Sequence, residues 1–194
     1  MCGIVACSTQ KSNPEFLVRS LLKKIEHRGP DNTSFFSESN ISLGSCRLSI
    51  MDLSNKANMP MIDKTGRFVI VYNGEIYNFK ELKKKFQIST KTDSDTEVIL
   101  ELYAKFREKC LDELNGIFSF IIFDKLENNF FCARDPIGVK PFYYFYNDLN
   151  FIASSEIKSF HEFNSKNLNF KVVKKYLTTS FYDYGKSTFF ENIY

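Results

Sequence analysis

The sequence contains no tryptophan, only two histidines (His27 and His161), and no cysteine pair spaced as Cys-x-x-Cys. Its five cysteines are an odd number, and the two histidines lie far apart, so the ligand spacing of a zinc site is missing and we expect no metal. No apolar run approaches the ~20 residues that a membrane-spanning helix needs, and the N-terminus has no signal-peptide pattern. These absences favour a protein of a reducing cytoplasm with no membrane partner.

An excess of one charge sign is also missing. The 26 Lys and Arg residues against 23 Asp and Glu residues leave a net charge of +3, too small to indicate nucleic acid as a partner. Bulky apolar residues, by contrast, are plentiful: 43% of the chain is hydrophobic, with 21 Phe and 10 Tyr. A 194-residue chain of this composition can bury the core of one domain, which argues against disorder.

Apolar runs alternate with helical patterns along the chain, which predicts an α+β layered domain. Strands are expected at residues 3–8, 32–37, 41–49, 67–72, 117–124, 130–134, 141–146 and 149–154. Helices are expected from Asn13 and Pro14 to the Gly29-Pro30 stop, from Asn78 with Glu81 in a capping box, from Ser94 or Asp95 onward, and over 172–179.

The N-terminal stretch Met1-Cys2-Gly3-Ile4-Val5 places a cysteine directly after the initiator methionine. Removal of Met1 is expected because Cys is small, and it would leave Cys2 with a free α-amine beside its thiol. Such an amine titrates near ~7.7–8.0 and can accept a proton from a thiol of pKa ~8.5. Cys2 is therefore either a nucleophile with its own base or a small apolar residue that leads into a strand.

Three other polar groups stand in apolar surroundings, and each has two interpretations. Arg47 lies within a small, apolar strand, so its fork pairs with either a buried structural carboxylate or a substrate carboxylate. Asn73-Gly74 is typical of a hairpin turn, but the amide and a nearby backbone N–H could also form an oxyanion hole. Asp95 either caps the following helix or holds a substrate ammonium.

Taken together and in order, the motifs resemble the glutaminase domain of glutamine-dependent asparagine synthetases, which are class II glutamine amidotransferases. The matching stretches are Met1-Cys2-Gly3-Ile4, His27-Arg28-Gly29-Pro30-Asp31, Arg47-Leu48-Ser49-Ile50, Tyr72-Asn73-Gly74-Glu75-Ile76-Tyr77-Asn78, Ser94-Asp95-Thr96-Glu97, Leu114-Asn115-Gly116, Arg134-Asp135, Gly138-Val139-Lys140-Pro141 and Ser155-Glu156-Ile157-Lys158. They cover nearly the whole chain.

This resemblance implies a four-layer αββα sandwich of the N-terminal-nucleophile hydrolase type and a site for L-glutamine. Cys2 would be the nucleophile, with its α-amine as the base, and Asn73 and Gly74 would form the oxyanion hole. The glutamine α-carboxylate would bind Arg47. The α-ammonium would bind Glu75 and Asp95, and the backbone around Ile50 and Met51 would line the pocket. No cofactor is implied in this domain.

The resemblance also implies a larger protein that uses the released ammonia to convert aspartate to asparagine. Residues 1–185 would form the amidotransferase domain, and 186–194 would begin the connection to a C-terminal synthetase domain that binds ATP and Mg. We expect that domain to dock on Arg134, Asp135 and Lys140, unless these residues only shape a turn. A homodimer is compatible with the resemblance.

Two departures and three alternatives remain. Met59-Pro60 stands where the family usually has Gln-Pro, and Pro136 stands where Arg or Lys often follows the Arg-Asp pair. The alternatives are a glutaminase that feeds a sugar or phosphoribosyl acceptor, a non-catalytic interaction module, and an autoprocessing peptidase. Retention of the whole polar set argues against the module, and the single residue before Cys2 argues against the peptidase.

Overall fold

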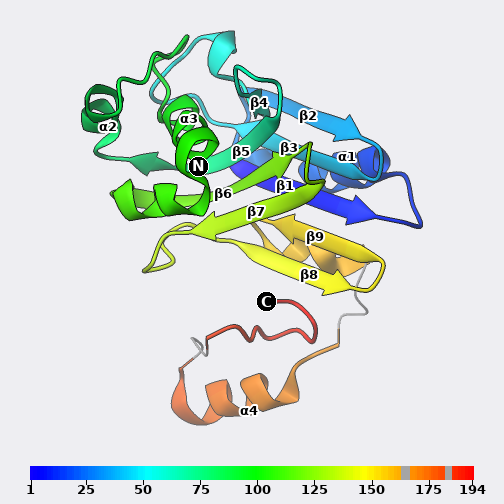
Figure 1. The fold of residues 1–194 in the computed structure, drawn as a ribbon. Helices are drawn as coiled ribbons and strands as arrows, with labels where there is room; N and C mark the ends of the chain where they lie inside the picture. The colour runs from blue at the N-terminus through cyan, green and yellow to red at the C-terminus, as the bar shows by residue number, and fades with distance from the viewer. Residues whose placement is uncertain (163–166, 182–184) are drawn as a thin grey trace.

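The computed structural model describes residues 1–162, 167–181 and 185–194. Two antiparallel sheets stack face to face, with helices on both outer faces (Figure 1). The five-stranded sheet has the order β2-β3-β1-β9-β8, and the four-stranded sheet has the order β4-β5-β6-β7. The four-layer αββα sandwich predicted from the sequence is confirmed.

The strands of the five-stranded sheet come from both ends of the domain. They are β1 (Gly3–Thr9), β2 (Asn32–Glu38), β3 (Ile41–Arg47), β8 (Tyr143–Asn147) and β9 (Asn150–Ser154). The second sheet is built from β4 (Met61–Ile62), β5 (Phe68–Ile76), β6 (Gly116–Asp124) and β7 (Asn129–Arg134). The central position of β1 is set by its pairing with β3 on one side and with β9 on the other, where Val5 lies opposite Ser154.

The helices divide between the two outer faces. One face carries α1 (Pro14–Lys24) with the 3₁₀ turns η1 (Glu26–Arg28) and η4 (Ile157–Glu162). The other carries α2 (Phe79–Lys85), α3 (Asp95–Phe106) and the 3₁₀ turn η3 (Arg107–Glu113), while η2 (Asn55–Ala57) lies in a loop. Leu17, Val18, Leu21 and Leu22 of α1 are buried, as the i, i+3, i+4 spacing requires.

The core has three apolar layers that match this stacking. The layer between the sheets contains Ile4, Ala6, Ile41, Leu43, Val69, Val71, Ile121, Phe123 and Ala153, all fully or almost fully buried. A second layer joins α1 to the outer face of the first sheet, and a third joins α3 to the outer face of the second sheet. Alternate residues of one strand therefore enter different layers, which fixes the register of the strands that carry the site.

One helix cap and one helix end differ from the sequence prediction. Asn13 caps α1 as expected, accepting from the Glu15 and Phe16 amides at 2.9 and 3.2 Å. The helix itself ends at Lys24, and the chain continues as η1 before Gly29. Asn78 forms no capping box, because its amide bonds to Glu113 and Asn115 on the next segment instead.

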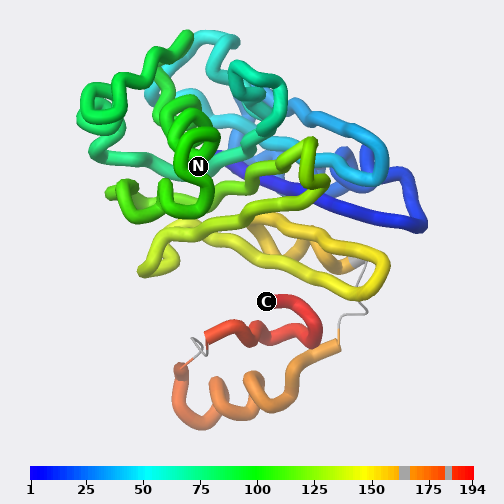
Figure 2. Tube along the Cα trace, in the orientation of Figure 1, coloured from blue at the N-terminus to red at the C-terminus, as the bar shows by residue number. Residues whose placement is uncertain are grey.

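The last described segments form a strip beside β8 (Figure 2). It contains α4 (Phe170–Thr179), and Leu168 forms an isolated bridge with Phe190. Tyr194 exchanges two backbone hydrogen bonds with Tyr144 of β8, and Ile193 is 2% exposed in the core layer of α1. The chain end thus packs on the sandwich, while the expected division near residue 185 stays a prediction.

Candidate active site

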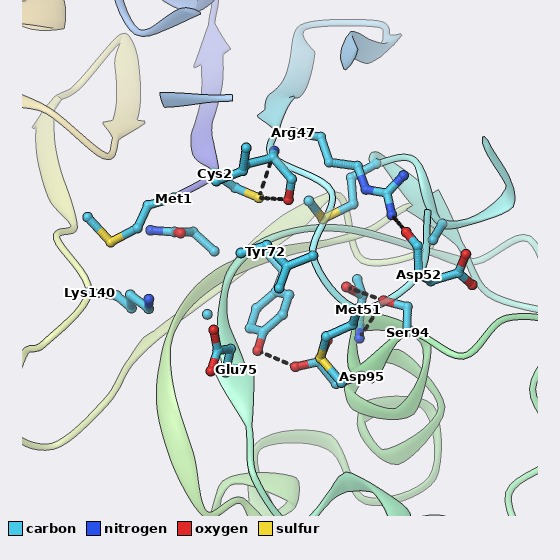
Figure 3. A pocket seen from close by; sticks show the side chains of 17 residues that line it. Met1, Cys2, Arg47, Met51, Asp52, Tyr72, Glu75, Ser94, Asp95 and Lys140 are labelled. Carbon is cyan, nitrogen blue, oxygen red and sulfur yellow. Dashed lines mark hydrogen bonds between the residues drawn. The ribbon is translucent and has the colours of Figure 1, made fainter. Parts of the chain in front are cut away.

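A cavity of about 90 Å³ opens where the N-terminal end of β1 meets the second sheet and the start of α3 (Figure 3). Its size suits a small molecule rather than a polymer. All eight site residues predicted from the sequence line it: Cys2, Arg47, Ile50, Met51, Asn73, Gly74, Glu75 and Asp95. Residues that are up to 93 positions apart in the chain therefore share one small site.

Cys2 presents its sulfur to this cavity from the start of the central strand. The Leu48 amide donates to Sγ at 3.4 Å, and the Leu48 carbonyl lies 3.7 Å from the same atom. The sulfur thus contacts polar backbone groups at the edge of the cavity. The geometry supports the nucleophile interpretation over a purely apolar role.

The other four thiols are unsuited to the same chemistry. Burial raises the pKa of Cys7, Cys110 and Cys132 to about 12, and burial also raises the pKa of Cys46. A thiol with such a pKa stays protonated at neutral pH and is a poor nucleophile. Cys2 is also the one cysteine among the residues that line the cavity.

Asn73 and Gly74 do not form a hairpin turn, because β5 continues through them to Ile76 and pairs with β6 over its whole length. The hairpin interpretation is therefore wrong. Asn73 is 1% exposed, and within the described part of the chain its Nδ2 atom has no hydrogen-bond partner. Because a buried amide donor is rarely left unpaired, an acceptor supplied by a ligand is the expected partner.

Glycine is required at position 74 by the close approach of β6. A Cβ added there would lie 2.4 Å from the Ile117 carbonyl oxygen and 2.8 Å from the Tyr72 ring. This packing holds the backbone beside Asn73 in a fixed place. Preorganised donors of this kind stabilise a developing oxyanion, so the oxyanion-hole interpretation fits the geometry.

Asp95 is the first residue of α3, and Ser94 is its N-cap, accepting from the Thr96 amide at 3.2 Å. The Asp95 side chain is thus free of the capping role and enters the cavity. One of its oxygens accepts from the Tyr72 hydroxyl at 2.7 Å and from the Ile76 amide at 2.9 Å. Burial raises the pKa of Asp95, which the two hydrogen bonds partly offset.

Arg47 is 6% exposed, and its guanidinium holds the following loop. One terminal nitrogen donates to the Ser54 carbonyl at 3.1 Å and to Asn58 Oδ1 at 2.8 Å, and the other donates to the Asp52 carbonyl. Within the described residues it forms no ion pair with a carboxylate, so the predicted structural pair is absent. Arg47 still lines the cavity and carries the charge that a substrate carboxylate needs.

Acidic and basic side chains both reach the cavity. Arg47 and Lys140 supply two positive charges, and Asp52, Glu75 and Asp95 supply three carboxylates. Figure 3 shows Lys140 and Glu75 on one side and Arg47 and Asp52 on the other. A free amino acid, which carries an ammonium and a carboxylate, matches such a lining.

Burial contradicts a docking role for the side chains of Asp135 and Lys140, which are 4% and 7% exposed. The Asp135 carboxylate accepts from the Phe118, Val139 and Lys140 amides at 3.2, 2.8 and 3.0 Å, so it shapes the turn. Those backbone donors outweigh burial and lower the pKa of Asp135. Arg134 donates to the Gly138 and Lys140 carbonyls and remains exposed, so its docking role stays a prediction.

Several cavity residues were not assigned to the site from sequence. Tyr72 was predicted only to end a strand, and Lys140 was predicted to belong to a docking surface. Met59, one of the departures from the family pattern, is 3% exposed and lines the cavity, and its peptide bond to Pro60 is cis. Only the position of Tyr72 directly before Asn73-Gly74 offered a signal.

Metal-ligand clusters and membrane-spanning helices are both absent from the described residues. Across the parts of the chain that the structure describes, no group of three or more His, Cys, Asp and Glu side chains is placed to hold a metal ion. Over the same parts, no helix has the length and apolar character to cross a membrane. The expectation that the chemistry proceeds without a metal stays a prediction.

Comparison with known proteins points to one family. A family model described as a glutamine amidotransferase domain matches residues 1–194. A putative glutamine-hydrolysing asparagine synthetase of Methanocaldococcus jannaschii is 42% identical, over 89% of this chain and 38% of its own length. Asparagine synthetase 1 of Bacillus subtilis is 33% identical, over 93% of this chain and 30% of its own. The chain thus spans well under half the length of these relatives.

Solved structures share the fold at lower identity. The glutamine phosphoribosylpyrophosphate amidotransferase of B. subtilis superposes with a TM-score of 0.72 at 17% identity, over 82% of this chain and 43% of that one. A second solved structure, described as the allosteric regulatory enzyme of purine biosynthesis, gives a TM-score of 0.69, also at 17% identity. At such identity the likeness speaks for the sandwich fold alone.

Proposed function

The chain belongs to the glutamine amidotransferase domain family, and from this premise we propose that it hydrolyses L-glutamine to glutamate and ammonia through a thioester on Cys2. One observation carries the proposal. The Cys2 sulfur lines the same small cavity as Arg47, Asp95 and Asn73, whose Nδ2 atom has no hydrogen-bond partner among the described residues. A nucleophile, an oxyanion donor and two opposite charges are the groups that this reaction needs.

In the first half of the reaction, the Cys2 thiolate attacks the side-chain amide carbon of glutamine. The thiol proton passes to the free α-amine of Cys2, and the carbonyl oxygen becomes an oxyanion that accepts from Asn73 Nδ2 and the Gly74 N–H. The intermediate collapses with cleavage of the C–N bond. The Cys2 ammonium returns its proton to the leaving nitrogen, so ammonia departs and the γ-glutamyl thioester remains.

In the second half, water attacks the thioester carbon, and the same amine accepts a water proton. The C–S bond breaks, glutamate leaves and the proton returns to the sulfur. Every proton is carried by Cys2 itself, and the remaining residues bind and orient the substrate. This base exists only if Met1, which also lines the cavity, is removed from the chain.

The opposite charges that line the cavity would select a free amino acid. Arg47 would bind the α-carboxylate through the guanidinium N–H groups that do not bond to the loop. Asp95 and Glu75 would bind the α-ammonium. Tyr72 and Ile76 both donate to one oxygen of Asp95, and the ammonium would bind the carboxylate from the cavity side. A glutamine side chain in a protein lacks both charges and would bind poorly.

The ammonia would supply ATP-dependent amidation of aspartate to asparagine, because the curated relatives with extensive coverage of this chain carry the name of that synthetase. ATP and Mg would bind a synthetase domain beyond the residues seen here, and that domain would be the partner of this one. The likeness to the phosphoribosylpyrophosphate enzyme does not favour that acceptor, since it rests on the fold alone.

The experiment compares the wild-type chain with Cys2→Ala and with Cys132→Ala, a control thiol that does not line the cavity. Ammonia and glutamate release from glutamine are measured, together with the intact mass. We expect a mass that lacks Met1, activity in the wild type and the control, and none in Cys2→Ala. Activity at the original rate in Cys2→Ala, or in a chain that retains Met1, would contradict the proposal.

A further inference from the structure

Arg28 reaches the nucleophile from behind the cavity. Its Nε donates to the Cys2 carbonyl oxygen at 3.0 Å, and its side chain is only 9% exposed. The side chain passes close to Gly3, where a Cβ would lie 3.3 Å from the Arg28 Cδ atom and 2.8 Å from Ile25 Cδ1. Arg28 therefore crosses the first residues of β1 and holds the backbone of Cys2 without lining the substrate cavity.

Glu156, which lies 128 residues after Arg28 in the chain, binds its guanidinium. Its Oε1 atom accepts from Arg28 Nη1 at 3.0 Å, and the same oxygen lies 2.9 Å from His27 Nε2. Lys158 Nζ lies 3.0 Å from the second oxygen, Oε2. Burial acts to raise the pKa of Glu156, but its hydrogen bonds to Arg28, Lys158 and His27 lower it overall, so the carboxylate is ionised at neutral pH.

The backbone around Glu156 is itself fixed to β1. The Ile4 amide donates to Ser155 Oγ at 3.0 Å, and the Ser155 amide donates to the Ile4 carbonyl at 3.0 Å. Ser155 is fully buried. The turn after β9 thus joins β1 two residues beyond Cys2 and sets the place from which Glu156 meets Arg28.

We propose that Glu156 and Arg28 are positioning residues for the Cys2 nucleophile, which deepens the proposed function and rests on it. In a chain that begins at Cys2, no preceding peptide holds this residue, and chain ends fray unless they are tied down. The Arg28 contact fixes the Cys2 carbonyl, and Glu156 fixes the guanidinium. A shift of about 1 Å in a reacting group can lower a rate by about two orders of magnitude.

A purely stabilising ion pair is the competing explanation, and one detail disfavours it. Within the described residues, the remaining terminal nitrogen of Arg28, Nη2, is buried and has no hydrogen-bond partner. An arrangement selected for stability alone would satisfy that donor or leave it in water. The two nitrogens that are used connect Cys2 to Glu156, as a positioning role requires.

The test is steady-state glutaminase kinetics of the full chain. For Glu156→Gln, which removes the charge at nearly constant shape, we expect kcat to fall about 10- to 100-fold with KM within about twofold. Arg28→Lys keeps the charge, but a lysine cannot donate to Cys2 and Glu156 through one planar group. Its kcat should therefore fall by a similar factor, with KM nearly unchanged. The double variant should lose no more than the worse single variant, because both act through one contact.

Lys158→Ala is the matched control, since it removes a cation from the same carboxylate but leaves the Arg28 contact. Its kcat should stay near the wild-type value. The inference is overturned if Glu156→Gln keeps its kcat, if it changes only KM, or if Lys158→Ala loses as much. Should Glu156→Gln not fold, Glu156→Asp replaces it, and a wild-type kcat in that variant would overturn the inference. A wild type that releases no ammonia would instead refute the proposed function.

Discussion

The Tyr72 hydroxyl donates a 2.7 Å hydrogen bond to Asp95, so the tyrosine directly before the proposed oxyanion pair also fixes the proposed ammonium anchor. Burial and the Asp95 carboxylate raise the pKa of Tyr72 well above its usual range, which keeps the phenol protonated and donating. Tyr72 is 3% exposed and its ring packs against Gly74. The proposed ammonium anchor and the proposed oxyanion pair thus contact the same side chain.

Tyr72→Phe should raise the KM for glutamine by about tenfold and leave kcat within about twofold. The variant loses a hydrogen bond to a charged group, a contact typically worth about 1.5–3 kcal/mol, but keeps the ring beside Gly74. Because that bond favours the ionised Asp95, KM should also begin to rise at a higher pH than in the wild type. Tyr103→Phe, a buried tyrosine outside the cavity, is the control for loss of a hydroxyl.

Asp95→Asn should weaken glutamine binding and stabilise the fold. The folded-state pKa of Asp95 is raised, so between its unfolded and folded values the folded protein holds more protons and the free energy of unfolding falls as pH rises. At neutral pH the wild type has lost that stability, and an asparagine oxygen still accepts from Tyr72 and Ile76. We expect a higher Tm at pH 7 and KM raised roughly 10- to 100-fold.

The stability gain of Asp95→Asn should shrink as the pH falls below the unfolded pKa of Asp, near ~3.9, where both side chains are neutral. Thermal unfolding across this range measures it. A variant that is less stable than the wild type at pH 7 would show that Asp95 is a structural anchor for β5. A variant with an unchanged KM would remove Asp95 from the ammonium site.

Asn73→Ala should lower kcat about 10²- to 10³-fold, the usual loss for one oxyanion donor, with little change in Tm. The reason is that Asn73 Nδ2 has no partner to lose in the described residues. Asn78→Ala is the opposite control, because its amide bonds to Glu113 and Asn115 at 2.9 and 3.1 Å. It should lower Tm and leave kcat near normal; the same pattern for Asn73→Ala would assign that residue a structural role.

Arg47→Ala should raise KM and lower Tm together. Loss of a charge-assisted contact to the substrate is worth about 1.5–3 kcal/mol, and the variant also releases the loop that Arg47 ties through Asp52, Ser54 and Asn58. Asn58→Ala removes one loop contact and spares the charge. If it reproduces the whole KM effect, the loop rather than the guanidinium recognises the substrate.

Lys140→Glu should lower the glutaminase activity of this chain by about tenfold or more, since it adds a negative charge to a cavity that already holds Asp52, Glu75 and Asp95. Arg134→Glu, six residues earlier and outside the cavity, should leave this activity nearly unchanged. Activity assays on the two variants separate the roles. Equal activity in both would return Lys140 to the docking surface expected from the sequence.

The sandwich could be predicted because its strands and helices have local sequence patterns. Most of the cavity could be predicted because the family motifs occur in order along the chain. Apolar runs located the strands, Asn13 with Pro14 located α1, and the resemblance named eight residues that the structure brings together. For Asn73-Gly74 the local sequence predicts the wrong structure. The dipeptide usually turns a hairpin, and only its pairing with Ser119 and Phe118 of β6 keeps it extended.

The contacts that sequence missed are all long-range. Nothing near Arg28 indicates that its partner is Glu156, 128 residues later, and nothing near Tyr72 indicates Asp95. Lys140 was expected on a docking surface, yet the turn that contains it places its side chain against the cavity. The residues around Asn78 are typical of a helix cap. Its side-chain amide instead bonds to the Glu113 carbonyl and the Asn115 N–H, which lie more than 30 residues later in the chain.

The pairing of β1 with β9 has a consequence for the timing of synthesis. The strand that carries Cys2 lies in the middle of its sheet, but its neighbour on one side, β9, begins only at Asn150. Closing so long a loop is slow relative to local contacts, so the proposed nucleophile is translated early and set in place only after β9 has been made. We expect a nascent chain that stops before Asn150 to bind no glutamine, and ribosome-bound chains of increasing length would measure when binding begins.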